Sequence, residues 1–295
     1  MPPSKITKGI ILAAGAGTRL YPSTFPISKI LLPVYDRPMV YYPLFTLMSA
    51  GIRDILIITN ERDRLNFERT LRDGSQFGVR ITYEVQQVQR GIADAFIIGE
   101  KFTDGGPCVL ILGDNIFHGE DLDRLMEEAS KDVSNATVFA HWVPDPERFG
   151  VAEFDRGGNV ISLEEKPKNP KSNYAVIGLY FLPGDAVEKA KTLKPSARGE
   201  LEITDLNLMY LREGRLKVKT VSDDTVWMDA GTFDSLLDSA NYIKDMDVRR
   251  ETKILCPEIE ALRKGYVTKE QMAAWIEPMK EGDYYKGVIK FMGTM

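Results

Sequence analysis

The sequence predicts an α/β fold built around a mostly parallel central sheet. Two observations lead to this prediction. Apolar runs typical of buried strands alternate with helix-like segments through the first half of the 295-residue chain, and the turns between them are short. Hydrophobic residues make up 43% and charged residues 27% of the chain, which is the balance of a globular protein with material for a sizeable core.

The first half of the chain supplies most of the predicted sheet. We expect strands at Gly9–Ala13, Asp54–Thr59, Arg80–Val85, Cys108–Leu112 and Ala136–Trp142. Helices are expected between them at Met39–Ala50, Arg62–Leu71, Ile92–Lys101 and Leu122–Lys131. Ligands of parallel sheets bind at the carboxyl ends of the strands. Gly15 and Asp114 both follow predicted strands, so we expect them to meet at that edge.

The second half of the chain has a mixed pattern. Asp155–Asn159 is rich in turn residues and lies between two β-type runs, Gly150–Phe154 and Val160–Glu164, which predicts a β-hairpin. The elements expected after it are a strand at Tyr174–Leu182, helices at Gly184–Thr192 and Glu202–Glu213, and strands at Lys217–Val221 and Thr225–Met228.

The last part of the chain is predicted to be helical from Phe233 onward. Thr268 and Gln271 have the spacing of a capping box, which marks the start of one of these helices. No repeat or low-complexity linker divides the chain. We therefore expect one α/β core followed by a helical tail, which packs either between subunits or on the core of its own chain.

A loop of small residues directly after the first strand predicts a polyphosphate site. The loop extends from Leu12 to Thr18, and Arg19 and Lys29 follow it. Small residues let backbone N–H groups approach an anion closely, and the two side chains add positive charge on the same side.

Two common phosphate-binding motifs do not fit this loop. A Walker A motif requires Gly, four residues and then Gly-Lys-Ser/Thr, and the sequence contains no such string. A dinucleotide-binding motif requires a third glycine where Leu20 stands and a helix directly afterwards. Pro22, Pro26 and Pro33 disfavour that helix, so Gly17 to Pro33 is expected to wrap around the ligand as an extended loop. The same prolines argue against a dehydrogenase.

Two aspartates are candidates for metal ligands. Asp114 follows a predicted strand beside the phosphate loop, and Asp229 stands in Trp-Met-Asp-Ala-Gly-Thr. Mg²⁺ binds a few carboxylates together with phosphate oxygens, so two aspartates at one phosphate site predict a magnesium site. The alternative is that each aspartate only caps a turn or a helix.

The remaining charged candidates are ambiguous by themselves. Glu165 and Lys166 end a predicted strand, where such pairs are commonly solvated, and Arg198 stands in a polar loop. The two histidines, His118 and His141, fit neither a catalytic triad nor a metal site. Transfer to a phosphate oxygen needs no strong base, because a phosphomonoester with a second pKa near 6 is already largely dianionic at pH 7.

Composition excludes several classes of partner. The net charge of −5 argues against a macromolecular nucleic acid as partner. Cys108 and Cys256 form no disulfide framework and are expected to be buried thiols. No apolar run approaches the ~18 residues of a membrane span. The expected compartment is the cytoplasm, with no membrane partner.

The strings Ala13–Pro22 and Ser28–Pro33 resemble the signature of the sugar-phosphate nucleotidyltransferases. The resemblance continues through Pro38–Leu44, Ala50–Leu56, Leu112–Phe117, Ser162–Pro167 and Lys194–Asp205 and into the helical tail. These segments are most similar to the glucose-1-phosphate thymidylyltransferase group, in its long, tetrameric form.

The resemblance implies a division of the chain and a reaction. A Rossmann-like nucleotidyltransferase core would occupy residues 1–240, with a nucleotide-binding part to about residue 142 and a sugar-phosphate-binding part with the hairpin over about 143–240. Residues 241–295 would form a helical region for oligomer contacts and allostery. The implied substrates are dTTP and glucose 1-phosphate, the cofactor Mg²⁺ and the assembly a homotetramer. The sugar phosphate would attack in line, without a general base, giving dTDP-glucose and pyrophosphate.

The resemblance also implies roles for individual residues. The catalytic residues would be Arg19, Lys29, Asp114 and Lys166. The nucleotide would be bound by Leu12, Ala13, Ala14, Gly15, Ala16, Gly17, Thr18, Gln86 and Gly91. The sugar phosphate would be bound by Asn115, Gly150, Glu165, Lys166, Val176 and Arg198. The metal would be held by Asp114 and Asp229.

Departures from the thymidylyltransferase pattern leave the base and the sugar open. Ala14 and Ala16 replace a Gly and a Ser, Ile30 replaces a Gln, and Phe149 replaces a Tyr beside the sugar. The alternatives are UTP as the donor or a nonstandard hexose phosphate as the acceptor. An alternative of a different class is a non-catalytic regulatory subunit.

Overall fold

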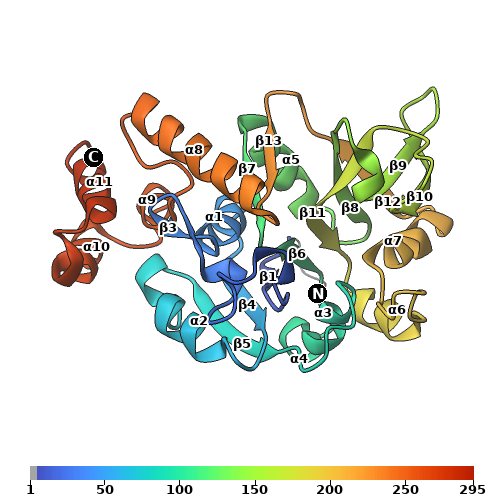
Figure 1. The fold of residues 1–295 in the computed structure, drawn as a ribbon, viewed down its shortest axis with the longest axis horizontal. Helices are drawn as coiled ribbons and strands as arrows, with labels where there is room; N and C mark the ends of the chain where they lie inside the picture. Colours follow the sequence, from blue (N-terminus) through green and yellow to red (C-terminus); the bar gives the residue numbers. More distant parts are fainter. Residues whose placement is uncertain (1–4) are drawn as a thin grey trace.

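The computed structural model describes residues 5–295 and has one central sheet of nine strands. The strands are β1 (Lys8–Leu12), β4 (Asp54–Thr59), β5 (Arg80–Val85), β6 (Cys108–Leu112), β8 (Ala136–Trp142), β9 (Gly150–Phe154), β10 (Val160–Glu165), β11 (Tyr174–Leu182) and β12 (Leu216–Thr220). Their order is β10-β9-β11-β6-β1-β4-β5, and β8 joins β11 to β12 (Figure 1).

The half of the sheet around β1 is parallel. β1 runs parallel to β4 and β6, β4 to β5, and β12 to β8. The antiparallel pairs are those of β11 with its neighbours and the predicted hairpin β9–β10. The predicted α/β fold is confirmed, and its sheet becomes antiparallel on the side that holds β11.

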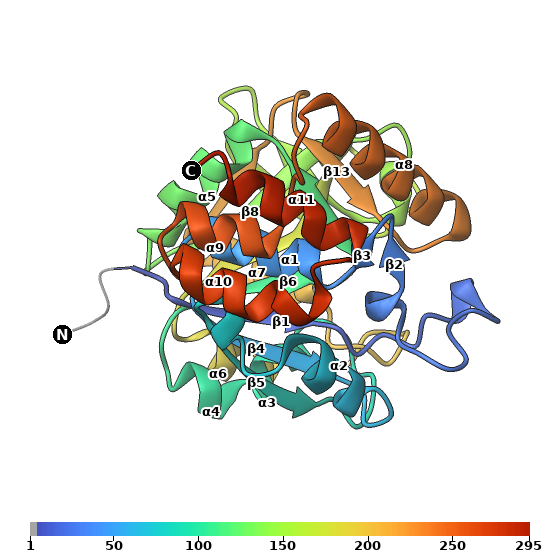
Figure 2. The same ribbon diagram turned by 90° about the vertical axis from the view of Figure 1, so that its left-hand side faces the viewer.

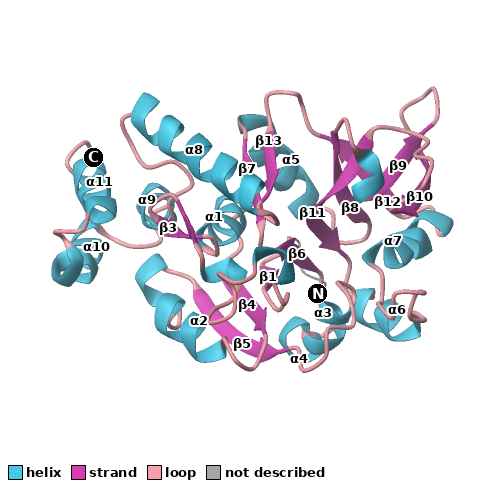
Figure 3. Ribbon diagram, in the orientation of Figure 1, coloured by secondary structure: helices cyan, strands magenta, loops and turns pink. Residues whose placement is uncertain are grey.

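Helices cover both faces of the sheet, as Figure 3 shows. They are α1 (Tyr41–Ser49), α2 (Arg64–Leu71), α3 (Asp94–Ile98), α4 (Glu100–Thr103), α5 (Glu120–Ser130), α6 (Ala186–Thr192) and α7 (Ile203–Arg212). Because successive side chains of a strand point to opposite faces, β1 contributes Ile11 to one core and Ile10 to the other. The first core contains α1 and α5, and the second contains α3, α6 and α7.

Two features within residues 92–118 differ from the expected elements. The helix expected at Ile92–Lys101 is divided into α3 and α4 at Gly99, where a side-chain Cβ would lie 2.9 Å from Ile10 Cδ1. A further strand, β7 (Asn115–His118), was not predicted from the sequence. It pairs antiparallel with β13 (Val226–Asp229), outside the main sheet.

The segment from Gly17 to Pro33 contains no α-helix, as its prolines predict. It carries only two short 3-10 turns, at Thr18–Leu20 and Lys29–Leu31. The chain then forms a small hairpin of β2 (Pro33–Val34) and β3 (Arg37–Pro38). The N–H of Val40 donates to the carbonyl of Ile30 at 2.9 Å, so the hairpin returns beside the turn that carries Lys29.

The C-terminal region is helical, as expected. It consists of α8 (Phe233–Arg249), α9 (Pro257–Arg263), α10 (Lys269–Ile276) and α11 (Asp283–Met292). The predicted capping box of Thr268 and Gln271 is present at the start of α10. Figure 2 shows α9, α10 and α11 over the side of the molecule that holds α1, and α9 packs on α1.

The expected division at residue 240 falls within α8. The division of the chain into functional parts stays a prediction. No helix within residues 5–295 is both long and apolar enough to cross a membrane.

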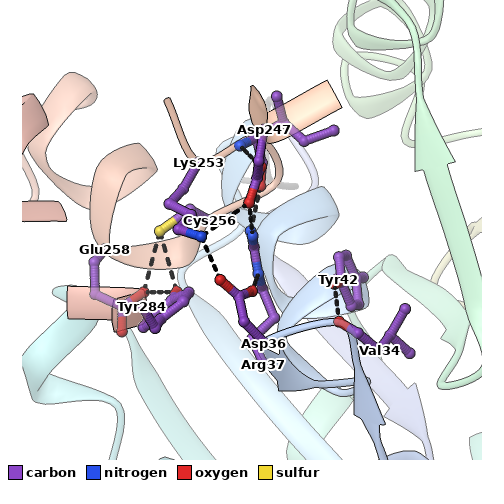
Figure 4. A network of polar contacts seen from close by, with 10 residues as sticks. Val34, Asp36, Arg37, Tyr42, Asp247, Lys253, Cys256, Glu258 and Tyr284 are labelled. Carbon is purple, nitrogen blue, oxygen red and sulfur yellow. Dashed lines mark hydrogen bonds and ion pairs between the residues drawn. The ribbon is translucent and has the colours of Figure 1, made fainter. Parts of the chain in front are cut away.

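A group of charges around the buried Arg37 joins the β2–β3 hairpin to the C-terminal region (Figure 4). We call it the anchor cluster, and it consists of Asp36, Arg37, Asp247 and Lys253. The Arg37 guanidinium donates to Asp36 Oδ1 at 2.8 Å, to Asp247 Oδ2 at 2.5 Å and to the carbonyl of Ile254. Lys253 pairs with both aspartates. Each charge of this cluster therefore has at least one partner of opposite sign.

Candidate active site

The phosphate loop and Asp114 lie at the same edge of the sheet. Leu12 at the end of β1 is in register with Leu112 at the end of β6. The N–H of Gly113 donates to the carbonyl of Leu12 at 3.0 Å. The chain segments that follow these strands, with Gly15 and Asp114, therefore begin side by side, and the predicted meeting of the two strand ends is confirmed.

The loop closes around the stem of Lys29. Gly17 has a φ of 64°, in the left-handed region that favours glycine, and its carbonyl accepts from Thr24 Oγ1 at 2.8 Å. A Cβ at Gly17 would lie 3.3 Å from Lys29 Cβ, and one at Gly15 would lie 3.7 Å from Lys29 Cε. Gly17 therefore gives the stem of Lys29 space that a side chain at position 17 would restrict, whereas the contact at Gly15 is an ordinary one.

Four charged residues meet beyond the strand ends. We call them the site cluster: Arg19, Lys29, Asp114 and Asp229. Lys29 Nζ donates to Asp114 Oδ2, and the other oxygen of Asp114 accepts from Asn115 Nδ2 at 3.0 Å. Asp229 on β13 lies opposite Asn115 on β7. A Cβ at Gly231 would be 2.8 Å from Arg19 Nη2 and 3.1 Å from Asp229 Oδ1, which places the arginine beside this aspartate.

The two aspartates have opposite pKa shifts. Burial works to raise the pKa of Asp114, but the Lys29 ammonium and the hydrogen bonds from Lys29 and Asn115 bring that pKa below its usual range. Burial, followed by the nearby Asp114 carboxylate, raises the pKa of Asp229. Two carboxylates lie close together here, and Asp229 has no ion-pair partner of positive charge within residues 5–295. A cation bound between them would therefore be stabilising.

The donor set suits a hard divalent cation. Within residues 5–295 no group of three or more His, Cys, Asp or Glu side chains is placed to hold a metal. The chain would therefore supply the two carboxylates, leaving other positions to phosphate oxygens and water, as Mg²⁺ prefers. The start of α8 is capped by Thr232, so Asp229 is not needed as its cap.

A cavity of about 610 Å³ opens beside the site cluster. It is bounded by β6, β7, the β9–β10 hairpin, β11 and the start of α7. The candidate residues in its wall are Arg19, Asp114, Asn115, Gly150, Glu165, Lys166, Val176 and Asp229. The structure thus brings together eight residues from distant segments that the sequence analysis had singled out.

Hydrogen bonds hold the carboxylate of Glu165 in the wall of the cavity. Its two carboxylate oxygens accept from Thr204 Oγ1 at 2.6 Å and from Arg198 Nη2 at 3.2 Å. A Cβ at Gly150 would lie 3.0 Å from the Thr204 hydroxyl, so this glycine permits the close approach of the hairpin to α7. Arg198 does not line the cavity but is tied to it through Glu165. Lys166 has a φ of 45°, which turns the chain sharply at the end of β10.

The candidates for base recognition lie outside the cavity wall. Gln86 is buried, and its Nε2 donates to Asp94 Oδ2 at 2.9 Å and toward the Gly91 carbonyl at 3.4 Å. Gln89 Nε2 donates to the carbonyl of Ala14 at 2.9 Å. The phosphate loop and the segment from Gln86 to Gly91 are therefore neighbours beyond the end of β1.

Sequence reasoning did not single out several residues of the cavity wall as site residues. They are Ile92, Leu112, Arg148, Gly178, Tyr180, Ile203, Thr204 and Trp227. Phe149, which the resemblance places beside the sugar, also lines the cavity. The sequence holds a signal for Trp227. It stands two residues before Asp229, and the alternation of a strand places the side chains of these two residues on one face.

The sequence of this chain is similar to those of known proteins over nearly its whole length. Residues 8–246 match the model of the nucleotidyl transferase family. A glucose-1-phosphate thymidylyltransferase of Xanthomonas campestris is 51% identical over 95% of this chain and 95% of its own length. The enzyme of the same name from Neisseria gonorrhoeae is 50% identical, over 97% of this chain and 99% of its own.

Solved structures give the same assignment. A structure named as a glucose-1-phosphate thymidylyltransferase from Bacillus anthracis, in complex with sucrose, is 45% identical with a TM-score of 0.75, over 81% of this chain and 95% of that one. A UDP-glucose pyrophosphorylase complexed with UDP-glucose is 26% identical with a TM-score of 0.71, over 82% and 99%. With a matching family model, full-length relatives and a shared fold, this chain belongs to the nucleotidyl transferase family.

Proposed function

We propose that this protein is a glucose-1-phosphate thymidylyltransferase. It transfers a thymidylyl group from dTTP to glucose 1-phosphate and releases pyrophosphate. The observation that carries the proposal is the similarity to enzymes of that name, 51% and 50% identical over almost the whole chain. The site cluster beside a cavity of about 610 Å³ supports it, because the reaction joins two phosphorylated substrates.

The reaction places few demands on proton transfer. An oxygen of the sugar phosphate forms a bond to the α-phosphorus of dTTP while the bond from that phosphorus to the bridging oxygen of pyrophosphate breaks. The attacking phosphate is already largely dianionic at pH 7, so no group has to remove a proton from it. The residues have to align the two substrates and to balance negative charge.

The charged residues supply this balance. Arg19 would stabilise the charge on the α-phosphate. Lys29 would give up its ion pair with Asp114 and bind the departing pyrophosphate instead. Lys166 and Arg198 would hold the phosphate of the sugar. These roles rest on the placement of Arg19 and Lys166 in the cavity wall and on the contacts of Lys29 and Arg198 with residues that line it.

The uncharged residues would select the substrates. The loop from Leu12 to Thr18 would cradle the triphosphate with its N–H groups, and Gln86 and Gly91 would contact the pyrimidine. The hexose would be contacted by Asn115, Gly150, Glu165 and Val176.

Asp114 and Asp229 would hold Mg²⁺, the cofactor proposed here. When bound, the ion would neutralise phosphate charge and orient the triphosphate. The two carboxylates fit this part because the pKa of Asp229 is raised by burial and by its neighbour Asp114. Added cation would relieve that repulsion.

UTP in place of dTTP is a second candidate. It is favoured by the likeness to a UDP-glucose pyrophosphorylase in complex with UDP-glucose. The two nucleotides differ at the 5-methyl group of the base and at the 2′-hydroxyl of the sugar, so both contacts have to be tested by substrate choice.

The test is pyrophosphate release with Mg²⁺ and glucose 1-phosphate, comparing dTTP, UTP, CTP, GTP and ATP, with the nucleotide sugar identified by mass. We expect dTTP to have the highest kcat/KM. A preference for UTP would keep the chemistry and overturn the base assignment. No release with any nucleotide, or with other hexose 1-phosphates, would favour a non-catalytic subunit.

We also propose a cytoplasmic homotetramer, a dimer of dimers, with the C-terminal region as its oligomer and allosteric element. Support comes from the apolar side chains that α8 exposes, Phe233, Leu237 and Val248. A second cavity, of about 680 Å³, lies where α8 approaches β7 and α5. Sedimentation equilibrium tests the tetramer, and inhibition by a dTDP-sugar that is not competitive with dTTP tests the allosteric element.

A further inference from the structure

Trp227 and Asn115 meet across a pair of strands beside the site cluster. β13, which carries Trp227 and Asp229, pairs antiparallel with β7, which begins at Asn115. Trp227 Nε1 donates to Asn115 Oδ1 at 2.7 Å. Asn115 is 3% exposed, so this hydrogen bond lies within the wall of the cavity.

The donors around Asn115 determine which way its amide faces. The N–H of Gly178 also donates to Asn115 Oδ1, at 3.3 Å. An indole N–H and a peptide N–H can only donate, so the oxygen of the amide has to face both. The NH2 group is thereby turned to the other side, where it donates to Asp114 Oδ1 at 3.0 Å. In the opposite orientation the NH2 group of Asn115 would face the N–H groups of Trp227 and Gly178, and no hydrogen bond could form between them.

Asn115 is one of two side chains that hold the Asp114 carboxylate. The second is Lys29, which donates to Asp114 Oδ2. Within residues 5–295 no other side chain hydrogen-bonds to Asp114. In the proposed function Lys29 moves to the pyrophosphate, and Asn115 is then the remaining side-chain donor that keeps this carboxylate in place.

We propose that Trp227 is a positioning residue for the metal-binding carboxylate Asp114. Its indole N–H fixes the amide of Asn115, and the amide in turn fixes the carboxylate. The inference rests on the proposed function, in which Asp114 holds Mg²⁺. Trp227 also packs against Phe149, with ring centroids 5.0 Å apart, so a role limited to shaping the sugar cavity is the competing explanation.

A double-mutant cycle separates the two explanations. The variants are Trp227→Phe, which keeps a ring but removes the donor, Asn115→Ala and the double variant. Metal binding is measured directly, by the loss of the free Mn²⁺ signal in electron paramagnetic resonance. The Mg²⁺ concentration for half-maximal pyrophosphate release and the KM for glucose 1-phosphate are measured alongside.

We expect Trp227→Phe to weaken Mn²⁺ binding and to raise the half-maximal Mg²⁺ concentration by about tenfold each, as the loss of one hydrogen bond to a buried acceptor does. The KM for glucose 1-phosphate should change much less. In the Asn115→Ala background the same substitution should have no further effect on Mn²⁺ binding, because the link to Asp114 is already lost.

Two results would overturn the inference. One is an equal effect of Trp227→Phe with and without Asn115. The other is a raised KM for glucose 1-phosphate with unchanged Mn²⁺ binding, which would assign Trp227 to the sugar cavity. Trp142→Phe is the matched control, since Trp142 is 51% exposed. Asn115→Ser replaces Asn115→Ala if thermal unfolding shows that the alanine variant does not fold.

Failure of the proposed function can be distinguished from failure of this inference about Trp227. It would appear as a wild-type protein that releases no pyrophosphate from dTTP and glucose 1-phosphate. The Mn²⁺ binding cycle would still report whether Trp227 and Asn115 act together on Asp114.

Discussion

The site cluster and the anchor cluster each contain two cations and two carboxylates, yet the structure arranges them differently. In the anchor cluster every charge has a partner, and Arg37 alone reaches two aspartates and a carbonyl. In the site cluster only Lys29 and Asp114 are paired. Arg19 and Asp229 form no ion pair within residues 5–295. Two cations and two carboxylates thus form one group in which every charge is paired and one group in which two charges have no ion-pair partner within residues 5–295.

This difference follows from what surrounds each cluster. The anchor cluster lies between the β2–β3 hairpin and the end of α8, and its central Arg37 is 2% exposed, while Lys253 lines the cavity of about 680 Å³. The site cluster lies where the strands β1 and β6 end, beside an open cavity. A buried charge has to be paired by the protein itself, whereas a charge beside a cavity can be paired by a ligand. The incomplete cluster is therefore the one that we expect to bind phosphates and metal.

The largest effect is expected on stability, from the anchor cluster. Replacing Arg37 by Met would leave Asp36 and Asp247 with Lys253 alone and should cost about 3–5 kcal/mol in the free energy of unfolding, measured with denaturant. The kcat/KM of the folded enzyme should be unchanged. Arg80→Met is the matched control: its ion pair with Asp54 is exposed, so the loss should be below ~1 kcal/mol. Equal losses in the two variants would contradict the comparison.

The site cluster should show the reverse pattern. Replacing Arg19 or Asp114 by Ala should lower kcat at least ~100-fold, because each removes a charge that the transition state requires. The unfolding midpoint of Arg19→Ala should stay near that of the wild type, because Arg19 forms no ion pair within residues 5–295. Arg156→Ala, in the exposed turn of the hairpin, serves as the control. Near-normal turnover in both site variants would rule out the proposed site.

A smaller effect is expected at Ile30, which follows the lysine of the site cluster. Its side chain is 1% exposed and packs toward Gly113, outside the cavity wall. Ile30→Gln should lower stability by about 1–3 kcal/mol, because it buries an amide without a partner. The ratio of kcat/KM for dTTP to that for UTP should not change. A shifted ratio would show that this position contacts the base after all.

The smallest effect is expected at Glu258, beside the anchor cluster. Glu258 is fully buried, and this burial raises the pKa of its carboxyl group. Its Oε1 atom has no hydrogen-bond partner within residues 5–295. The unfolded chain loses this proton near pH 4.5 and the folded chain only at higher pH. Stability contributed by the protonated form is therefore lost as the pH rises through that window.

Glu258→Gln imitates the protonated form. It should reduce the decline of the free energy of unfolding above pH 4.5, while leaving stability below that pH close to the wild type. Denaturant unfolding at a series of pH values measures this. A parallel decline in the two proteins would show that Glu258 titrates normally in the fold.

Much of the fold could be predicted from the sequence where a long apolar run signals one element. β8 and β11 have the expected bounds, and the order of strands and helices around β1 is confirmed. β7 was missed because its four residues directly follow Gly113 and Asp114 and lack a periodic pattern of their own. α3 and α4 meet at Gly99, and the close packing of Gly99 on Ile10 is a contact that no local pattern records.

Part of the site could be predicted because it follows from the predicted order of the strands. The adjacency of the phosphate loop and Asp114 follows from parallel strands, so topology alone predicts it. The placement of Trp227, Arg148 and Thr204 in the cavity wall depends on the β7–β13 pair and on the packing of the hairpin against α7. These contacts join segments far apart in the chain, and only the folded structure reveals them.

The most direct test of the account is the stereochemistry of transfer from a dTTP analogue with sulfur at the α-phosphorus. In the proposed reaction glucose 1-phosphate attacks directly in line, at a site that aligns the two substrates and neutralises their charge. We therefore expect inversion at phosphorus in the dTDP-glucose analogue, determined by phosphorus NMR. Retention would contradict it, because two successive displacements would mean that a residue of the protein forms a covalent intermediate.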